Sequence, residues 1–427
     1  MLNEAGTSKY YPFLDGWRGF AILWIILGHI VPTYDIDLAG KATRCLFNFV
    51  EVVYLAVDIF FIITGFLITG ILLADADKFD VKKFIKKRVF RILPLYFVLI
   101  FVAFAMNQTI PPLGINIKAT LNKAHAYIIT DADRGFFTLR DDKGNRTSVK
   151  QKEFPYNKVG DIVEIMRSGI GTAVLPSMSS QESVFPHLLL MQNYYPYSRT
   201  MPVLSHTWFL SVVVHFYIFY VVSGFFIFKF VKNPQKRKLF LSLFVFSLIV
   251  FINIFRYKFG VNYGMYYRMT HFRMDAILFG CLLKLGERPY LEKIGVLGKR
   301  VSSLFFFAVG FILFSILVLK APNEYAYAFS NPYIFTLSYI MFGFMMIGTY
   351  RKVALSGFIF ENSLIRWIGR YSYGIYLWHY PFMFLYYYSI RRFVHLNNFV
   401  SILIQGLLSI VIGAGLEMLF SRKRLKQ

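Results

Sequence analysis

The chain has 427 residues, of which 56% are hydrophobic, 19% aromatic and only 16% charged. The apolar residues fall in long uninterrupted blocks that exceed what the core of one soluble domain can bury, so an ordinary soluble protein is excluded. A net charge of +24 would suit a nucleic-acid-binding protein, but membrane proteins gather Lys and Arg in their cytoplasmic connections. We therefore predict a polytopic membrane protein with no nucleic-acid partner.

Apolar runs of about 17 to 25 residues, the length that crosses a bilayer as a helix, predict an all-α bundle of about ten transmembrane helices. The predicted spans are residues 13–33, 49–73, 92–106, 208–228, 239–256, 272–286, 301–319, 333–350, 371–390 and 399–420. We expect no cleavable signal before the first span. Connections on the side of the N-terminus are the richer in Lys and Arg, which predicts that both termini are cytoplasmic.

The first predicted helix carries Asp15, Arg18 and His29 within the apolar segment LDGWRGFAILWIILGHI. Ionisable groups in hydrocarbon are costly and usually functional. At 100° per residue, the steps from Arg18 to His29 turn the helix about 20° past three circles and rise about 16 Å, so both side chains share one face. Asp15, one turn before Arg18, is its expected partner. A snorkelling anchor is the alternative for Arg18, and a structural hydrogen bond for His29.

The third helix is preceded by the basic segment FIKKRVFRILPLYF, which contains Arg88 and Arg91. Two guanidiniums three residues apart on a helix point to nearly the same side, and such a pair suits bidentate binding of phosphates. For this segment alone, an ordinary basic anchor at the inner headgroups is the favoured alternative.

Residues 107–206 form the one large predicted connection and divide the chain into three parts. Residues 1–106 supply helices 1 to 3 with a basic cytoplasmic loop, and residues 207–427 supply helices 4 to 10 with a basic tail. Charged residues, short β-prone runs and the turn signal DDKGN fit a small extracytoplasmic domain or flap with a hairpin as well as they fit a partly disordered extracytoplasmic loop.

Five blocks follow one another in a recognisable order: LDGWRGFAILWIILGHI, VDIFFIITGFLITGILL, RVFRILPLYF, HTWFLSVVVHFYIFY and IGRYSYGIYLWHYPF. In this order they resemble the integral-membrane acyltransferase 3 family. The resemblance implies an O-acyltransferase of a bacterial inner or plasma membrane. Such an enzyme moves an acyl group, most commonly acetyl, from cytoplasmic acyl-CoA to a hydroxyl of an extracytoplasmic polysaccharide or glycolipid. Acetyl-CoA or another acyl-CoA is then a donor substrate, and no bound cofactor is expected.

On the same resemblance, His29 matches the essential histidine and Arg18 its companion, while Arg88 and Arg91 match the paired arginines expected to bind acyl-CoA. One segment departs from the family. Where members carry acidic residues and a Gln after Trp-x-Leu-Ser, this chain has Val213, Val214 and His215. A carboxylate for that role would have to come from elsewhere, for example from Asp58.

His29 is the candidate general base, because a neutral imidazole can accept a hydroxyl proton near pH 7. Asp58 in the second helix would fix its tautomer; a salt bridge to an arginine is the alternative. Contacts to the acceptor or to the developing oxyanion are assigned to polar and aromatic side chains of the later blocks: His206, Trp208, Tyr373, Tyr376 and His379. For Trp208 the interfacial aromatic belt is the favoured alternative, and for His379 the alternatives are packing or lining of the donor channel. No Cys/His cluster has metal-ligand spacing, so no metal is expected.

Two other classes of function remain open. A transporter or flippase would use the buried Asp, Arg and His side chains to bind substrate or protons, but transporters often carry internal repeats and the sequence shows none. A passive scaffold or lipid-binding protein would gain nothing from ionisable groups inside its spans. We therefore expect acyl-CoA, a surface glycan and membrane lipids as partners.

Overall fold

The computed structural model describes most of the chain. The described residues are 10–34, 41–74, 79–109, 124–133, 136–141, 146–150, 162–168, 171–176, 184–195, 201–259, 267–292, 296–320, 332–350, 358–386, 390 and 396–422.

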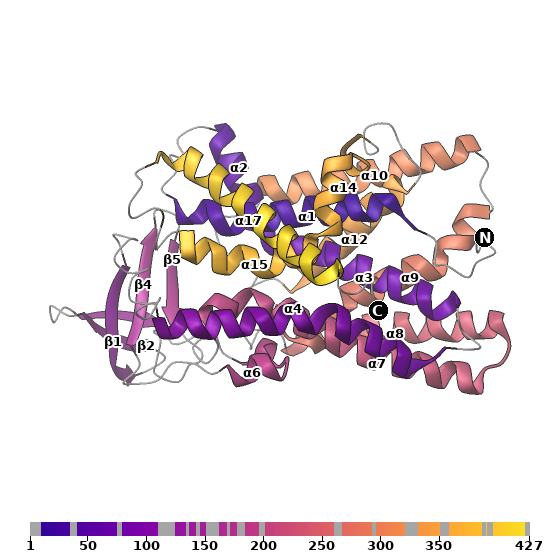
Figure 1. The fold of residues 1–427 in the computed structure, drawn as a ribbon, viewed down its shortest axis with the longest axis horizontal. Coiled ribbons are helices and arrows are strands. Elements are labelled where there is room, and N and C mark those ends of the chain that lie inside the picture. Colours follow the sequence, from indigo (N-terminus) through magenta and orange to yellow (C-terminus); the bar gives the residue numbers. More distant parts are fainter. Residues whose placement is uncertain are drawn as a thin grey trace.

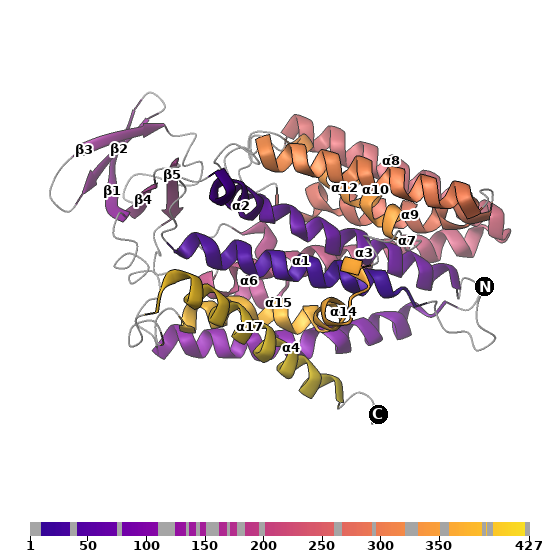
Figure 2. The ribbon, with the colours of Figure 1, turned by 90° about the horizontal axis from the view of Figure 1, so that it is seen from above.

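Long helices lie side by side along the long axis of the molecule (Figures 1 and 2). They are α1 (Pro12–Ile30), α3 (Ala56–Ala74), α4 (Val81–Thr109), α7 (Trp208–Phe230), α8 (Pro234–Phe259), α9 (Thr270–Glu292), α10 (Val296–Lys320), α12 (Tyr333–Thr349), α15 (Ser372–Leu385) and α17 (Asn398–Arg422). Shorter elements are α2 (Lys41–Glu51), α6 (Phe185–Leu188), α14 (Ser363–Arg370) and the 3-10 turns η1 (Val31–Thr33), η2 (Val52–Leu55), η4 (Gln192–Tyr194) and η6 (Pro202–Thr207).

Within the described residues, seven helical segments are long and apolar enough to cross a membrane. They are Pro12–Ile30, Cys45–Ala74, Val81–Met106, Val203–Phe230, Pro234–Phe259, Val301–Leu319 and Asn398–Ser421. The helix α12 is apolar but shorter, and α9 and α15 occupy the predicted spans 272–286 and 371–390. The predicted polytopic, all-α membrane bundle is confirmed, while the count of ten spans stays a prediction.

The bundle turns large apolar side chains outward. Phe101 on α4 is 72% exposed and Phe251 on α8 is 62% exposed. Exposed apolar surface on long apolar helices is what a lipid-facing bundle requires, because hydrocarbon rather than water surrounds it.

Glycines let neighbouring helix backbones approach closely. A Cβ placed on Gly65 of α3 would lie 1.8 Å from the carbonyl oxygen of Ile277 on α9, and one on Gly16 of α1 would lie 1.7 Å from that of Phe360. Only a residue without a Cβ fits at either place. Small-residue contacts of this kind are typical of membrane helix packing, and they fix the helix α1 that carries Arg18 and His29.

Residues 107–206 contain a five-stranded antiparallel sheet in the order β3-β2-β1-β4-β5. The strands are β1 (Ala124–Asp133), β2 (Phe136–Asp141), β3 (Arg146–Lys150), β4 (Ile162–Ser168) and β5 (Gly171–Pro176). β2 and β3 pair as a hairpin, with Arg140 opposite Arg146. The predicted turn between them, at residues 142–145, lies outside the described residues. The sheet lies beyond the end of the bundle at which α1 finishes (Figures 1 and 2).

Candidate active site

A pair of histidines joins α1 to α15. The Nδ1 atom of His29, in the last turn of α1, lies 2.8 Å from the Nε2 atom of His379. The two ring planes are inclined by only 16° and the centroids lie 5.1 Å apart, so the rings meet side by side, as an in-plane hydrogen bond requires. His379 is 1% exposed, whereas His29 is only partly buried. His29 is therefore the more exposed member of the pair.

Backbone carbonyls of α15 accept hydrogen bonds from two histidine rings. The Nδ1 atom of His379 lies 2.7 Å from the carbonyl oxygen of Tyr376, and the Nε2 atom of His206 lies 3.1 Å from that of Leu377. The helical N–H that would pair with Leu377 belongs to residue 381, which is Pro381 inside α15. Because proline has no N–H, its position leaves the Leu377 carbonyl available to His206.

Two tyrosines enclose these rings. The ring of Tyr380 stacks on His206 with centroids 5.0 Å apart and meets His29 edge-on at 5.1 Å. The hydroxyl of Tyr376 donates to the backbone carbonyl of His206. We call His29, His206, Tyr376, His379 and Tyr380 the histidine cluster. The sequence predicted four of these residues singly, and it missed Tyr380 and the pairing of His29 with His379.

Arg18 lies at the other end of α1. Its Nη1 atom is 3.5 Å from Oδ1 of Asp15, the partner that helical spacing predicted. The second oxygen of Asp15 accepts a hydrogen bond of 2.6 Å from the hydroxyl of Tyr10. The Arg18 side chain keeps 22% of its surface exposed. It is thus held by a carboxylate and only partly buried.

Arg88 and Arg91 lie on α4, which begins at the same end of the bundle as α1 (Figure 1). The guanidinium of Arg88 lies over the rings of Phe84 and Tyr217, at 5.3 Å and 5.9 Å from their centroids. Arg91 is exposed. The positive charges of Arg88 and Arg91 both act on Arg18, so the three guanidiniums form one electropositive region, here called the arginine region.

Tyr373 links the arginine region to α15. Its hydroxyl donates a hydrogen bond of 2.6 Å to the carbonyl oxygen of Ile92, next to Arg91 on α4. Tyr373 was predicted as a possible oxyanion donor, and in the structure it holds two helices together at this point.

Asp58 pairs with an arginine and not with His29. Its Oδ1 atom lies 2.5 Å from Nη2 of Arg273 on α9, and both side chains are fully buried. The predicted contact between Asp58 and His29 is not found in the part of the chain that the structure describes, where His29 contacts His379 instead. A full positive charge is the stronger partner for a buried carboxylate, because an unpaired charge there is costly.

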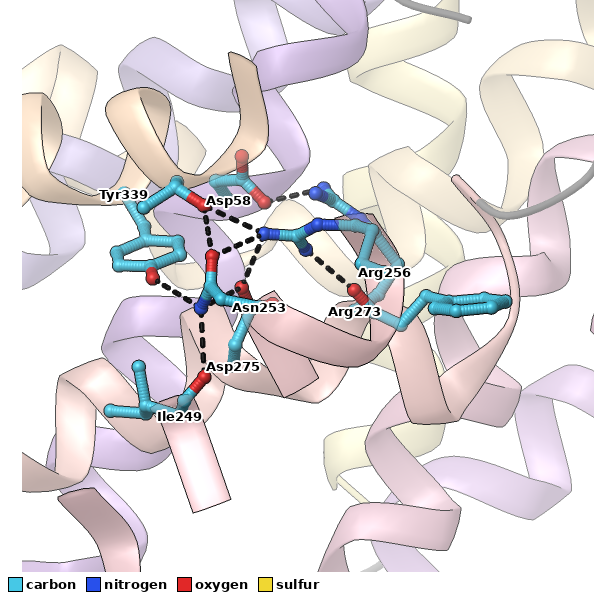
Figure 3. Close-up of polar contacts among 9 residues, drawn as sticks. Asp58, Ile249, Asn253, Arg256, Arg273, Asp275 and Tyr339 are labelled. Atoms are coloured by element: carbon cyan, nitrogen blue, oxygen red, sulfur yellow. Dashed lines mark hydrogen bonds and ion pairs between the residues drawn. The ribbon is translucent and has the colours of Figure 1, made fainter. Parts of the chain in front are cut away.

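A second set of buried polar contacts lies beside the Asp58–Arg273 pair, and the two sets together are here called the buried network (Figure 3). Arg256 of α8 lies 2.9 Å from Asp275 of α9 and donates to the backbone carbonyl of Phe272 at 2.6 Å. Asn253 of α8 donates to the hydroxyl of Tyr339 on α12 at 3.1 Å. The network joins α3, α8, α9 and α12. The sequence signal that could have found it was the presence of Asp and Arg within predicted spans.

Trp208 is an interior aromatic residue. It is 8% exposed and meets the rings of Tyr267 and Phe61 edge-on, with centroids 5.7 Å and 6.3 Å away. Its ring therefore packs against aromatic side chains of the bundle. Among the described residues, no group of three or more His, Cys, Asp or Glu side chains is arranged to hold a metal ion.

The fold and the site define a multi-pass membrane protein with a histidine cluster inside its bundle and an arginine region at one end. Residues 11–418 match the family described as an acyltransferase domain, and the chain belongs to this family. The resemblance of the five sequence blocks is thereby confirmed. No solved structure matches the chain.

Two relatives carry informative names. The chain is 23% identical over 388 residues to O-acetyltransferase OatA of Staphylococcus aureus strain NCTC 8325, an alignment covering 89% of this chain and 52% of the relative. It is 25% identical over 393 residues to the peptidoglycan O-acetyltransferase OatA of Listeria monocytogenes, covering 89% and 50% respectively. The chain therefore spans about half the length of the curated relatives it matches.

Proposed function

We propose that this protein is a membrane O-acetyltransferase that moves an acetyl group from cytoplasmic acetyl-CoA to a hydroxyl of an extracytoplasmic polysaccharide. Membership of the acyltransferase family supports acyl transfer, and the names of the two relatives support acetyl transfer to a cell-wall glycan. The observation that carries the proposal is the separation along α1 of Arg18, which belongs to the arginine region, from His29, which belongs to the histidine cluster.

The arginine region suits the donor. CoA carries a pyrophosphate and a ribose phosphate, and Arg88 and Arg91 can each bind a phosphate through two N–H donors. Arg18 lies further along the same side of the bundle and would steady the chain that links the nucleotide to the thioester. Its rise of about 16 Å to His29 is a length that the extended pantetheine arm can bridge.

The histidine cluster suits the chemical step. His29 takes the proton of the acceptor hydroxyl while the oxygen attacks the thioester carbonyl. The carbon–sulfur bond then breaks, the acetyl group stays on the acceptor oxygen, and the CoA thiolate takes the proton back from His29. No proton is gained or lost overall, so no path to bulk solvent is required.

The test is acetyl transfer by the purified protein. We expect radiolabelled acetyl-CoA and de-O-acetylated peptidoglycan fragments to give labelled glycan together with free CoA thiol. The His29→Ala variant is the matched control for spontaneous transfer. Movement of acetyl-CoA or glycan across proteoliposomes without any labelled ester would contradict the proposal and favour the transporter alternative.

A further inference from the structure

We propose that His379 is a positioning residue that holds His29 with a proton on Nδ1 and a free lone pair on Nε2. The atom that takes the acceptor proton is then Nε2 of His29. This inference rests on the proposed function for its catalytic meaning, but the protonation pattern itself can be measured without any activity.

The protonation pattern of the two histidines follows from a backbone carbonyl oxygen, which can accept a hydrogen bond but cannot donate one. The carbonyl oxygen of Tyr376 has no proton to donate, so the Nδ1 atom of His379 at 2.7 Å must be protonated. A neutral imidazole has a single N–H, and the Nε2 atom of His379 therefore carries a lone pair. That lone pair faces Nδ1 of His29 at 2.8 Å. A hydrogen bond at this place requires the proton to be on His29 Nδ1, which leaves Nε2 of His29 unprotonated.

The opposite polarity requires a charged histidine. If His379 donated from Nε2 as well as from Nδ1, it would be an imidazolium inside the bundle, where it is 1% exposed. Asp58, the carboxylate that the sequence offered as a partner for this histidine pair, is bound to Arg273 instead. An unpaired buried cation is costly, so the neutral arrangement is favoured.

The same contact also serves the protonated intermediate. When His29 gains the acceptor proton, its Nδ1–H still points at the lone pair of His379, which stabilises the new positive charge. The hydrogen bond to His379 and the edge contact with Tyr380 restrict rotation of the His29 ring. His379 thus performs with a neutral ring the orienting role that a carboxylate performs in a catalytic triad.

Nitrogen NMR of the full-length protein in micelles tests the protonation pattern. Labelling histidine with ¹⁵N distinguishes a protonated ring nitrogen from one with a lone pair, and the His29 signals are those lost in His29→Asn. At neutral pH we expect a protonated Nδ1 and a free Nε2 for His29 in the wild type. A His29 ring protonated mainly on Nε2 would overturn the proposal whether or not the protein transfers acetyl groups.

Kinetics of two variants test the positioning role. His379→Leu removes the acceptor, and we expect kcat to fall at least about tenfold while KM for acetyl-CoA stays unchanged. In His379→Gln the side-chain oxygen can accept from Nδ1 of His29, so we expect part of kcat to return. The control is His271→Gln, which removes an exposed histidine of α9 and should keep wild-type kinetics. Equal kcat in wild type and His379→Leu would overturn the proposal and leave the proposed function intact.

Discussion

At the scale of single residues, the three histidines of the cluster differ in exposure and in hydrogen-bond partner. His206 and His379 are 5% and 1% exposed and bind backbone carbonyls of α15. His29 is bound by another histidine and is partly exposed. A buried ring with a backbone partner is held still, whereas a partly exposed ring with one free nitrogen can act on a ligand. The geometry therefore favours His29 as the base.

Removal of that base should affect the chemical step alone. We expect His29→Ala to lower kcat by about 10² to 10⁴, the usual contribution of a positioned general base, with little change in acetyl-CoA affinity. Steady-state transfer assays and equilibrium binding of acetyl-CoA measure the two quantities separately. Wild-type turnover in a folded His29→Ala protein would mean that the base lies elsewhere.

Removal of the paired arginines should weaken binding of the donor, acetyl-CoA. We expect Arg88→Ala/Arg91→Ala to raise KM for acetyl-CoA at least about tenfold, because two guanidiniums that bind phosphates are lost together. Arg88→Lys keeps the charge but loses the planar fork, so it should be impaired as well. Higher salt should weaken donor binding in the wild type more than in the double variant. Unchanged donor affinity in the double variant would assign these residues to membrane anchoring.

The sequence can predict contacts between residues close together on one helix, but not contacts that depend on how distant helices pack. Arg18 and Asp15 are three residues apart on one helix, and their predicted contact is present. His29 and His379 are 350 residues apart, and their contact depends on how α1 packs against α15. The sequence could not decide whether Asp58 binds His29 or an arginine, because this choice also depends on how distant helices pack. Arg273 became the partner once α9 packed against α3.

At the scale of the elements, hydropathy locates the spans but not every helix end. The helix α4 begins at Val81, before the predicted start at residue 92. Lys and Arg end an apolar run, yet they are good helix formers, so the helix continues through them. The tight crossing of α3 and α9 at Gly65 could not be read from apolar runs, because it depends on which helices become neighbours.

Breaking the Asp58–Arg273 pair should lower the stability of the folded protein. Asp58→Asn leaves Arg273 as an uncompensated buried charge, a change that typically costs about 3 to 5 kcal/mol. We expect a clearly lower midpoint of thermal unfolding in detergent. The double variant Asp58→Leu/Arg273→Met removes both charges and should recover much of the loss. If Asp58→Asn lost acetyl transfer while its midpoint of thermal unfolding stayed unchanged, Asp58 would have a catalytic role and not a structural one.

At the scale of the whole molecule, the sheet lies beyond the end of the bundle at which α1 and α4 finish (Figure 1), whereas the arginine region lies in the first halves of these two helices. The sequence indicated a folded piece in residues 107–206 through β-prone runs and a turn signal. It did not predict five strands, because strand pairing depends on contacts between residues far apart in the chain. The direction in which the bundle sits in the membrane rests on the excess of Lys and Arg in one set of connections.

The orientation of the bundle in the membrane can be tested directly. On the proposed function, the donor arrives from the cytoplasm and the acceptor from the outer side, so the two ends of the bundle must face opposite sides. Arg146 of β3 is exposed near the sheet end, and Asn233 lies exposed between α7 and α8. With Cys45 and Cys281 replaced by Ser, we expect Arg146→Cys to react with a membrane-impermeant maleimide on intact spheroplasts. Asn233→Cys should react only after permeabilisation, because it precedes a run of cytoplasmic cations. Labelling of both sites from the same side would contradict the topology, and the reversed pattern would place the arginine region away from cytoplasmic acetyl-CoA.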